Sequence, residues 1–340
     1  MSIQLLAPAM GASVSLYTDT QRAFRREEDK RAHLDGALTF KWYALEDTSI
    51  ERSLPAPVVF SFSDDDEKTG HYILLVSEYE DMRDPRTAFT DETTTSLYNL
   101  KADTKYYWCI QKDGVRSEIF FFYTTPDLPR CVRIDGVSNV RDVGGYLVAG
   151  GRIRQGLLYR GSELELHSHP TQTGVSDIRA LGLSTDLDLR GEAVGRVLFP
   201  TSSLLDMRYA LIPTVPYSAV LQKAHRKTTR AFFALLAKRS AYPIYAHCWG
   251  GADRTGTLFF LLGAFLGMSK NELIYEYEFT SLSRWGTRSR NHPPFSAFVA
   301  DFEALEGETY KQKATFFFLR KLRLTKKQLE SIEDIFIEKA

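Results

Sequence analysis

Two domains of different fold class are predicted from the sequence: an all-β sandwich over residues 1–126 and an α/β domain with a largely parallel sheet over residues 127–340. The first part holds short aromatic and β-branched runs separated by turn signals, which is typical of β-sandwiches. The second part alternates between short strands and stretches of helical length, which indicates an α/β fold. Residues 125–129 contain two prolines, which resist both helix and central strand, so this segment is the predicted linker.

The strands of the first domain are predicted from five hydrophobic runs. These runs lie at residues 40–43, 58–62, 72–76, 106–110 and 119–123. Residues 100–106 read Leu-Lys-Ala-Asp-Thr-Lys-Tyr and resemble the corner motif of fibronectin type III domains, with Tyr106 as the corner tyrosine. The resemblance implies an accessory Ig-like domain that orients its neighbour, self-associates or binds a protein partner. An unrelated β-sandwich is the alternative.

The elements of the second domain are predicted from hydrophobic periodicity and capping signals. Strands are expected at residues 157–160, 184–189 and 243–247, and helices at residues 174–181, 228–238 and 255–266. The last of these helices is strongly apolar, so we expect it to lie in the core. A terminal helix is expected after Thr325, which can form a capping box with Gln328.

Charge and cysteine count limit the class of protein. The 340 residues carry equal numbers of basic and acidic side chains, 43 of each. Residues 1–126 hold 14 Lys and Arg against 21 Asp and Glu, so the remainder is basic by the same margin, which suits an anionic substrate or serves solubility alone. Three cysteines, an odd number, argue against a disulfide-stapled secreted scaffold.

The sequence predicts neither a membrane span nor an evident signal peptide. No stretch of about eighteen uninterrupted apolar residues predicts a membrane span. The first residues lack the basic region of a signal peptide, so the default expectation is a cytoplasmic protein. Secretion is the alternative if a signal peptide has been removed.

One segment, His-Cys-Trp-Gly-Gly-Ala-Asp-Arg-Thr-Gly at residues 247–256, carries the predicted chemistry. A cysteine ends a strand, and an arginine six residues later opens a helix. Such a tight loop turns successive backbone N–H groups inward and makes a cradle for a phosphate dianion. Its glycines allow the close approach that the cradle requires, and its arginine offers a planar fork to two phosphate oxygens. The predicted phosphate-binding residues are Trp249, Gly250, Gly251, Ala252, Asp253 and Arg254.

Cys248 is the predicted nucleophile. A thiolate that faces a helix N-terminus and Arg254 is stabilised, so it can attack phosphorus and form a phosphocysteine intermediate. Thr255 is expected to stabilise the sulfur as the leaving group, and His247 to hold the loop by hydrogen bonds. A buried cysteine that only happens to precede an arginine is the alternative, but the glycines and the apolar helix in register argue against it. This chemistry needs no metal and no cofactor.

The segment at residues 247–256 resembles the HCxxGxxRTG signature of protein tyrosine and dual-specificity phosphatases. Residues 139–146, 156–164 and 186–190 resemble, in the correct order, further motifs of the bacterial protein tyrosine phosphatase family. The resemblance covers about residues 130–340. It implies a phosphatase of phosphomonoesters whose substrate is a phosphorylated protein or peptide, with no nucleic-acid partner. Ala252 stands where family members that act on lipid phosphates often carry Lys, which shifts the expectation from phosphoinositides toward phosphotyrosine.

The general acid is the least determined part of the predicted mechanism. The segment at residues 212–217, where tyrosine phosphatases usually carry an Asp, contains no carboxylate. Asp253 lies within the loop itself, where it can approach the leaving group. Asp188 ends a predicted parallel strand, where α/β sites collect their functional groups. We favour Asp253, because an ion pair with Arg190 is an equally good interpretation of Asp188.

Four polar residues outside the loop are interpreted as supporting residues. Asn139, Arg141 and Asp142 are expected to brace the sheet as a buried cluster, and Arg160 to join them or to line the pocket. The basic stretch at residues 284–290 is interpreted as a solvated surface loop, and approach to the phosphate-bearing substrate is the alternative. The alternative function is a catalytically weak module that binds phosphoproteins. A sulfurtransferase or arsenate reductase is disfavoured by the Arg-Thr-Gly ending.

Overall fold

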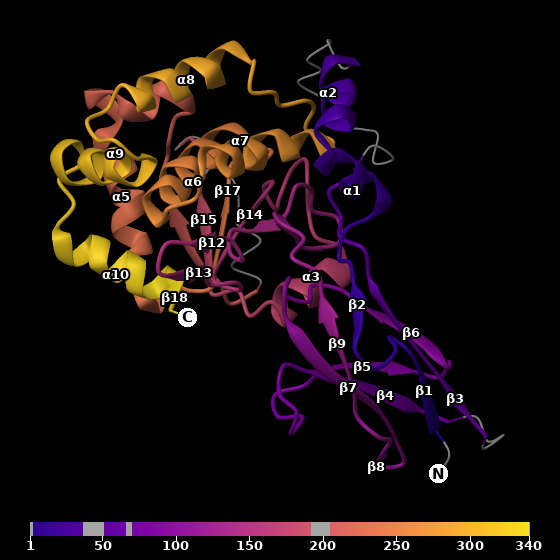
Figure 1. Cartoon of the computed structure of the whole chain (residues 1–340). Helices are drawn as coiled ribbons and strands as arrows, with labels where there is room; N and C mark the ends of the chain where they lie inside the picture. Colours follow the sequence, from indigo (N-terminus) through magenta and orange to yellow (C-terminus); the bar gives the residue numbers. More distant parts are fainter. Residues whose placement is uncertain (1–2, 37–50, 66–69, 192–204, 340) are drawn as a thin grey trace. The chain divides into compact units, whose positions relative to one another are not determined.

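The computed structural model describes residues 3–36, 51–65, 70–191 and 205–339 (Figure 1). The chain forms two compact units, one of Met1–Thr18 with Pro55–Arg130 and one of Asp19–Leu54 with Cys131–Ala340. The chain leaves the first unit for the second after Arg130, close to the predicted domain boundary after residue 126. The sequence did not predict that Asp19–Leu54 belongs to the second unit. The expected strand at residues 40–43 lies outside the described residues.

The described part of the first unit consists of strands in two sheets. One sheet has the order β1 (Ile3–Ala7), β3 (Val58–Asp64), β6 (Thr94–Leu97). The other has the order β2 (Ala12–Val14), β9 (Phe120–Thr124), β7 (Lys105–Lys112), β4 (Tyr72–Ser77), β5 (Arg86–Thr90), and β8 (Val115–Arg116) pairs with β7. Alternate residues are buried along β3, as the two-residue period of a strand requires. Phe60 of β3 and Trp108 of β7 lie in one core shared by both sheets, with ring centroids 5.2 Å apart.

Tyr106 makes the contact expected of a corner tyrosine. Its hydroxyl accepts a hydrogen bond of 2.8 Å from the backbone N–H of Lys101, five residues upstream. The side chain is buried in the shared core and stacks on Phe122 of β9. The hydrogen bond therefore ties the loop before β7 to the core.

The second unit is built on a mixed sheet of six strands. Its order is β10 (Arg130–Cys131), β11 (Arg141–Asp142), β14 (Leu158–Gly161), β17 (Ile244–His247), β15 (Thr185–Asp188), β16 (Arg208–Leu211). The four strands from β14 to β16 run parallel, and β11 is antiparallel to β14. The predicted α/β class of this domain is confirmed. A smaller sheet joins β12 (Leu147–Val148), β13 (Gly151–Ile153) and β18 (Ile337–Glu338).

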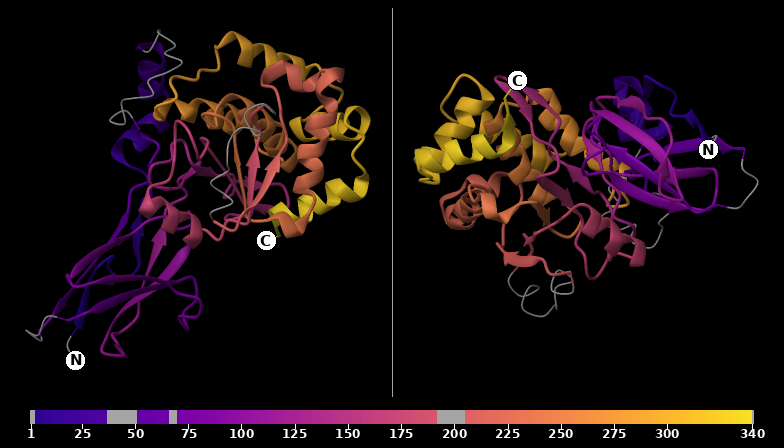
Figure 2. Two further views of the ribbon diagram at one scale, coloured as in Figure 1. Left: turned by 180° about the vertical axis from the view of Figure 1, so that it is seen from behind. Right: turned by 90° about the horizontal axis from the view of Figure 1, so that it is seen from below.

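Helices cover this sheet. In the described residues downstream of residue 131, the α-helices are α3 (Gln172–Ala180), α5 (Arg226–Leu236), α6 (Asp253–Leu266), α7 (Lys270–Glu278), α8 (Pro293–Glu303), α9 (Tyr310–Phe316) and α10 (Lys326–Phe336). Both views of the ribbon place α5, α6, α9 and α10 together on one side of the parallel strands (Figures 1 and 2). Every residue of α6 from Thr255 to Leu266 is buried, which explains why its sequence is apolar. The predicted capping box of Thr325 and Gln328 is present at the start of α10.

The segment Asp19–Leu54 is tied to the second unit by buried contacts. It contains α1 (Asp19–Arg25) and α2 (Glu27–Gly36). Phe24 of α1 packs edge-on against Phe279, and buried Lys30 of α2 pairs with Glu278 at 3.2 Å. Backbone N–H of Arg52 donates to Leu282 O at 2.7 Å. Among the described residues, no helix combines the length and the apolar character that crossing a membrane requires.

Candidate active site

The loop that carries the predicted chemistry joins the central strand β17 to α6. The strand ends at His247, as the sequence predicted, and the helix begins at Asp253, two residues before the predicted start at Thr255. Cys248 is 5% exposed and lines a cavity of about 460 Å³. The cavity is also lined by His167, Pro216, Tyr217, Trp249, Gly250, Ala252, Asp253, Arg254, Trp285 and Arg288.

Two glycines allow the loop its path. Gly251 has a φ of +64°, and a Cβ atom on it would lie 2.1 Å from the carbonyl oxygen of Gly161. A Cβ atom on Gly250 would lie 2.6 Å from the ring of Trp285. Both positions therefore exclude any side chain unless the backbone or the indole moves.

The carbonyl groups of the loop are held on the side away from the cavity. Gly250 O accepts from Nδ2 of Asn139 at 2.8 Å, and Gly251 O accepts from Nη2 of Arg160 at 2.7 Å. Trp249 O accepts from the backbone N–H of Glu163 at 3.0 Å. In a trans peptide the following N–H points opposite to the carbonyl, so the N–H groups that follow these carbonyls face the other way. This orientation produces the cradle of donors that a phosphate requires.

Asn139 is itself held from two sides. Its backbone has a φ of +60°, which asparagine tolerates better than most residues. Nη1 of Arg141 donates to its Oδ1, and its own N–H donates to Oγ of Ser53 at 3.2 Å. Asn139 and Arg160 thus contact the loop directly, whereas the sequence suggested that Asn139 braces the sheet. Ser53 was missed because nothing in the sequence links it to the loop.

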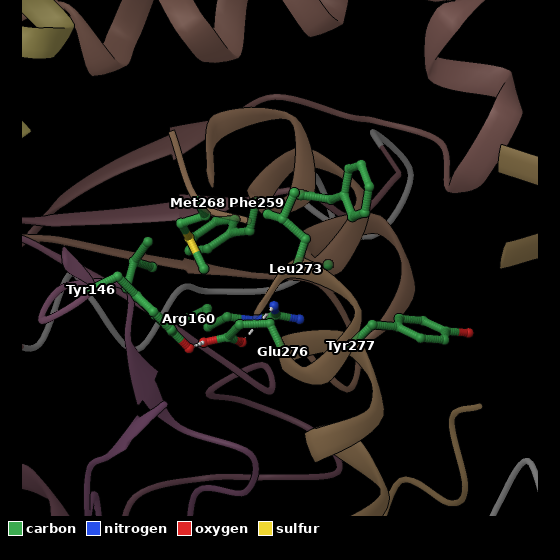
Figure 3. A pocket seen from close by; sticks show the side chains of 10 residues that line it. Tyr146, Arg160, Phe259, Met268, Leu273, Glu276 and Tyr277 are labelled. Atoms are coloured by element: carbon green, nitrogen blue, oxygen red, sulfur yellow. Dashed lines mark hydrogen bonds and ion pairs between the residues drawn. The ribbon is translucent and has the colours of Figure 1, made fainter. Parts of the chain in front are cut away.

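Glu276 of α7 contacts both Arg160 and Tyr146 (Figure 3). It pairs with Arg141 at 3.2 Å and Arg160 at 3.5 Å, and it accepts from the hydroxyl of Tyr146 at 3.1 Å. Burial, together with nearby Arg141, lowers the pKa of Arg160 to about 9. The enclosed cavity in this cluster measures about 20 Å³, room for about one water molecule, so it is no substrate site.

Asp142 has a structural contact pattern. Its carboxylate accepts from the backbone N–H groups of Gly144 at 2.8 Å and Gly156 at 2.6 Å. It therefore holds two loops beside β11 and β14 together.

His247 is buried and forms an ion pair with Asp186 of the neighbouring strand, Nε2 to Oδ1 at 2.8 Å. Burial opposes the charged imidazole, but Asp186 outweighs it and raises the pKa of His247 to about 9. The charged imidazole lies at the end of β17, one residue before Cys248. Asp186 was overlooked as a partner, although its alternation with Asp188 along β15 was a usable signal.

Arg254 lines the cavity, and Arg254 and Thr255 each have a buried polar atom. Neither Nη1 of Arg254 nor the Thr255 hydroxyl has a hydrogen-bond partner in the part of the chain that the structure describes. A phosphate oxygen would satisfy the Arg254 donor, and buried donors are rarely left unpaired. The bond from Thr255 to the cysteine sulfur that the sequence suggested is not among the described contacts.

Asp253 lines the cavity and is bound by two groups. Arg288 forms a bidentate ion pair with Asp253, in which Nε lies 2.8 Å from Oδ1 and Nη2 lies 2.9 Å from Oδ2. The hydroxyl of Tyr217 also donates to Oδ1 of Asp253. Although burial favours the neutral acid, Arg288 lowers the pKa of Asp253. In the free protein Asp253 is therefore a carboxylate.

Asp188 makes the ion pair that was its alternative interpretation. Its Oδ1 accepts from Nε of buried Arg190 at 2.9 Å, and its Oδ2 accepts from the hydroxyl of Tyr209 at 2.8 Å. Burial raises the pKa of Asp188, but Arg190 outweighs it and lowers the value.

The expectation of a solvated loop at residues 284–290 was wrong for three of its residues. Arg284, Trp285 and Arg288 are buried. The two arginines can be buried because Arg288 pairs with Asp253 and Arg284 donates to Oγ of Ser168 at 2.7 Å.

Aromatic side chains line the cavity around the loop. The ring of His167 lies 5.2 Å from Trp249 and 6.2 Å from Trp285. Pro216 and Tyr217 come from the segment at residues 212–217, in which the sequence offered no carboxylate. Tyr217 was missed because only the fold brings its hydroxyl to Asp253.

A strand, a glycine-bearing loop with cysteine and arginine, and a buried helix in this order define a cysteine-based phosphate-binding loop. The model of the tyrosine phosphatase family matches residues 132–337, and the chain belongs to this family. A predicted tyrosine-protein phosphatase of Cupriavidus necator is 30% identical over an alignment of 169 positions, which covers 42% of this chain and 60% of that protein. The chain thus spans less than two thirds of that relative.

Two solved structures of the Siw14 catalytic core, one of them the PP-IP phosphatase of S. cerevisiae in complex with citrate, are 16% identical to this chain. Each match covers 53% of this chain and 88% of the solved chain, with a TM-score of 0.30.

Proposed function

We propose that this protein is a cysteine-dependent phosphomonoester hydrolase. The observation that carries the proposal is the placement of Cys248 and Arg254 in one cavity, on a loop whose carbonyls are turned away by Asn139 and Arg160. Family membership supports the same chemistry.

The reaction proceeds in two displacements. The Cys248 sulfur attacks phosphorus, the bond from phosphorus to the leaving oxygen breaks, and that oxygen takes a proton from Asp253. Water then attacks the phosphocysteine, the sulfur–phosphorus bond breaks, and Asp253 accepts the proton from water. Arg254 and the loop N–H groups hold the equatorial oxygens, where charge develops in each transition state. Thr255 stabilises the departing thiolate.

Asp253 is the proposed acid, in preference to Asp188, because it lines the cavity. Its ion pair with Arg288 keeps it ionised in the free protein. A bound phosphate dianion places a like charge beside it, which raises the pKa and favours proton uptake. The acid is thus expected to be loaded only when substrate is present.

Phosphotyrosine on a protein or peptide is the proposed substrate. Trp249, Trp285 and Tyr217 offer aromatic surfaces to a phenyl ring above the loop. Ala252 adds no cation that would grip further phosphates of an inositol lipid. A panel of phosphotyrosine peptide, phosphoserine peptide and phosphoinositide tests this choice, with the highest kcat/KM expected for the phosphotyrosine peptide. Preference for either other substrate would overturn it.

A phosphoprotein-binding module without turnover is the second candidate, and the Asp253–Arg288 ion pair favours it. The two candidates differ in one assay. Hydrolysis of p-nitrophenyl phosphate by the wild-type protein, lost in Cys248→Ser, supports the hydrolase. Binding of a phosphotyrosine peptide with no turnover above background supports the binding module.

The first unit is proposed to be a fibronectin type III-like β-sandwich with an accessory role. Its two sheets with one core and the hydrogen bond from Lys101 to Tyr106 support this assignment. Self-association of this unit would appear as a concentration-dependent mass in analytical ultracentrifugation.

A further inference from the structure

A chain of hydrogen bonds leads from the candidate acid to a histidine. Tyr217 donates to Oδ1 of Asp253, its hydroxyl oxygen lies 2.9 Å from that of Tyr277, and the Tyr277 oxygen lies 3.2 Å from Nδ1 of His292. The three residues come from the 3₁₀ helix η3 (Tyr217–Leu221), from α7 and from the N-cap of α8. Figure 3 shows the Tyr277 ring directed away from the Arg160–Glu276 pair, which leaves its hydroxyl to this chain.

The direction of each hydrogen bond is fixed by counting protons. The Asp253 carboxylate can only accept, so Tyr217 uses its one proton on Asp253. Tyr277 must then donate to Tyr217, and the Tyr277 oxygen accepts from Nδ1–H of His292. Every proton in the chain therefore points toward Asp253. Burial raises the pKa of Tyr217 and of Tyr277, so both phenols keep their protons at neutral pH.

The two ends of the chain differ in their exposure to water. Tyr217 and Tyr277 are buried, whereas His292 is only half-buried. Asp253 and Tyr217 line the substrate cavity, so a bound phosphoester covers the direct route from solvent to the acid. The chain of hydrogen bonds offers the proton a second route to Asp253, through the protein.

We propose that His292, Tyr277 and Tyr217 form a proton relay that loads Asp253 while substrate occupies the cavity. The inference rests on the proposed function, in which Asp253 is the acid. A solvent proton binds Nε2 of His292 as Nδ1 passes its proton to Tyr277. Tyr277 passes its own proton to Tyr217, and Tyr217 passes its own to Asp253. The net change is one proton gained by the carboxylate, with His292 left neutral as the other tautomer.

The charges around His292 suit a group that passes protons on. Tyr277 on α7 and Tyr217 on η3 face the imidazole, and Arg288 and Asp253 act on it at longer range. Burial and Arg288 lower the pKa of His292, so the imidazole does not retain the proton.

The leaving group distinguishes a relay from a merely structural role. Phenol released from a phosphotyrosine peptide is a weak acid and needs a proton in the transition state, whereas p-nitrophenolate leaves without one. General acid catalysis contributes about 10²–10⁴-fold, so interrupting its supply is expected to cost about tenfold or more on the peptide. We expect Tyr277→Phe and His292→Ala to lose kcat by that factor on the peptide and less than about twofold on p-nitrophenyl phosphate.

Tyr275→Phe is the matched control. It lies on the same helix, and its hydroxyl has no hydrogen-bond partner among the residues described. We expect it to leave kcat unchanged on both substrates. Tyr277→Phe keeps the ring that stacks on Phe295 at 3.6 Å, so it remains informative if His292→Ala fails to fold.

Added imidazole supplies a second readout. It is expected to restore peptide turnover in His292→Ala, but not in the double variant with Tyr277→Phe. Equal losses on both substrates, or unchanged peptide turnover in Tyr277→Phe, would overturn the relay. A wild-type protein with no Cys248-dependent turnover of p-nitrophenyl phosphate would instead overturn the proposed function.

Discussion

Replacing Gly251 by alanine tests whether the shape of the loop creates the site. The new Cβ atom would lie 2.1 Å from Gly161 O, so the loop must shift by about 1 Å to reach an ordinary contact. A displacement of that size costs about 100-fold in rate when it moves reacting groups. The positive φ of +64° adds about 1–2 kcal/mol of backbone strain.

Gly182→Ala is the control that separates the backbone strain of a positive φ from the steric clash with Gly161. Gly182 has a φ of +65°, and a Cβ atom there would meet nothing within 4 Å. Urea denaturation should show a loss of about 1–2 kcal/mol in Gly182→Ala and a larger loss in Gly251→Ala. Kinetics on p-nitrophenyl phosphate should show kcat/KM unchanged in Gly182→Ala and reduced about 100-fold in Gly251→Ala. The reasoning would be refuted if the two variants had the same kcat/KM.

Three further outcomes are expected. Ser53→Ala removes the acceptor of the buried backbone N–H of Asn139, so urea denaturation should show a loss of about 1–3 kcal/mol in the free energy of unfolding. An unchanged midpoint would contradict the role of Ser53 in holding Asn139. The pKa of His247 is raised to about 9, so wild-type stability should be full below about pH 6.5 and fall as pH rises through 9. Asp186→Asn should abolish that fall in a series of denaturation curves. Arg288→Met leaves Asp253, whose side chain is only 19% exposed, without its cation, so it should destabilise the protein by up to about 3–5 kcal/mol, and a change under 1 kcal/mol would contradict the ion pair.

The sequence was most informative where the site is contiguous. The loop from His247 to Thr255 could be predicted because the spacing of cysteine, glycines and arginine is itself the mechanical requirement. The same holds for the strand before it and the apolar helix after it, since one face of a parallel sheet must bury that helix.

Contacts between distant segments could not be predicted from local patterns. The charge of Arg288 suggested a solvent-exposed side chain, because its partner Asp253 is 35 residues away in the sequence. Tyr217, Tyr277 and His292 carry no local signal, since they meet only after three elements have packed. Asp19–Leu54 interrupts the strands of the first unit, so its membership in the second depends on buried contacts such as that of Lys30 with Glu278.

The proposed nucleophile is tested most directly by trapping the intermediate. Wild-type protein is quenched in acid during turnover of p-nitrophenyl phosphate, and its peptides are analysed by mass spectrometry. We expect the mass of one phosphoryl group on the peptide that contains Cys248, and no such adduct and no turnover in Cys248→Ser. Turnover that persists in Cys248→Ser, or a phosphoryl group on another residue, would contradict the account.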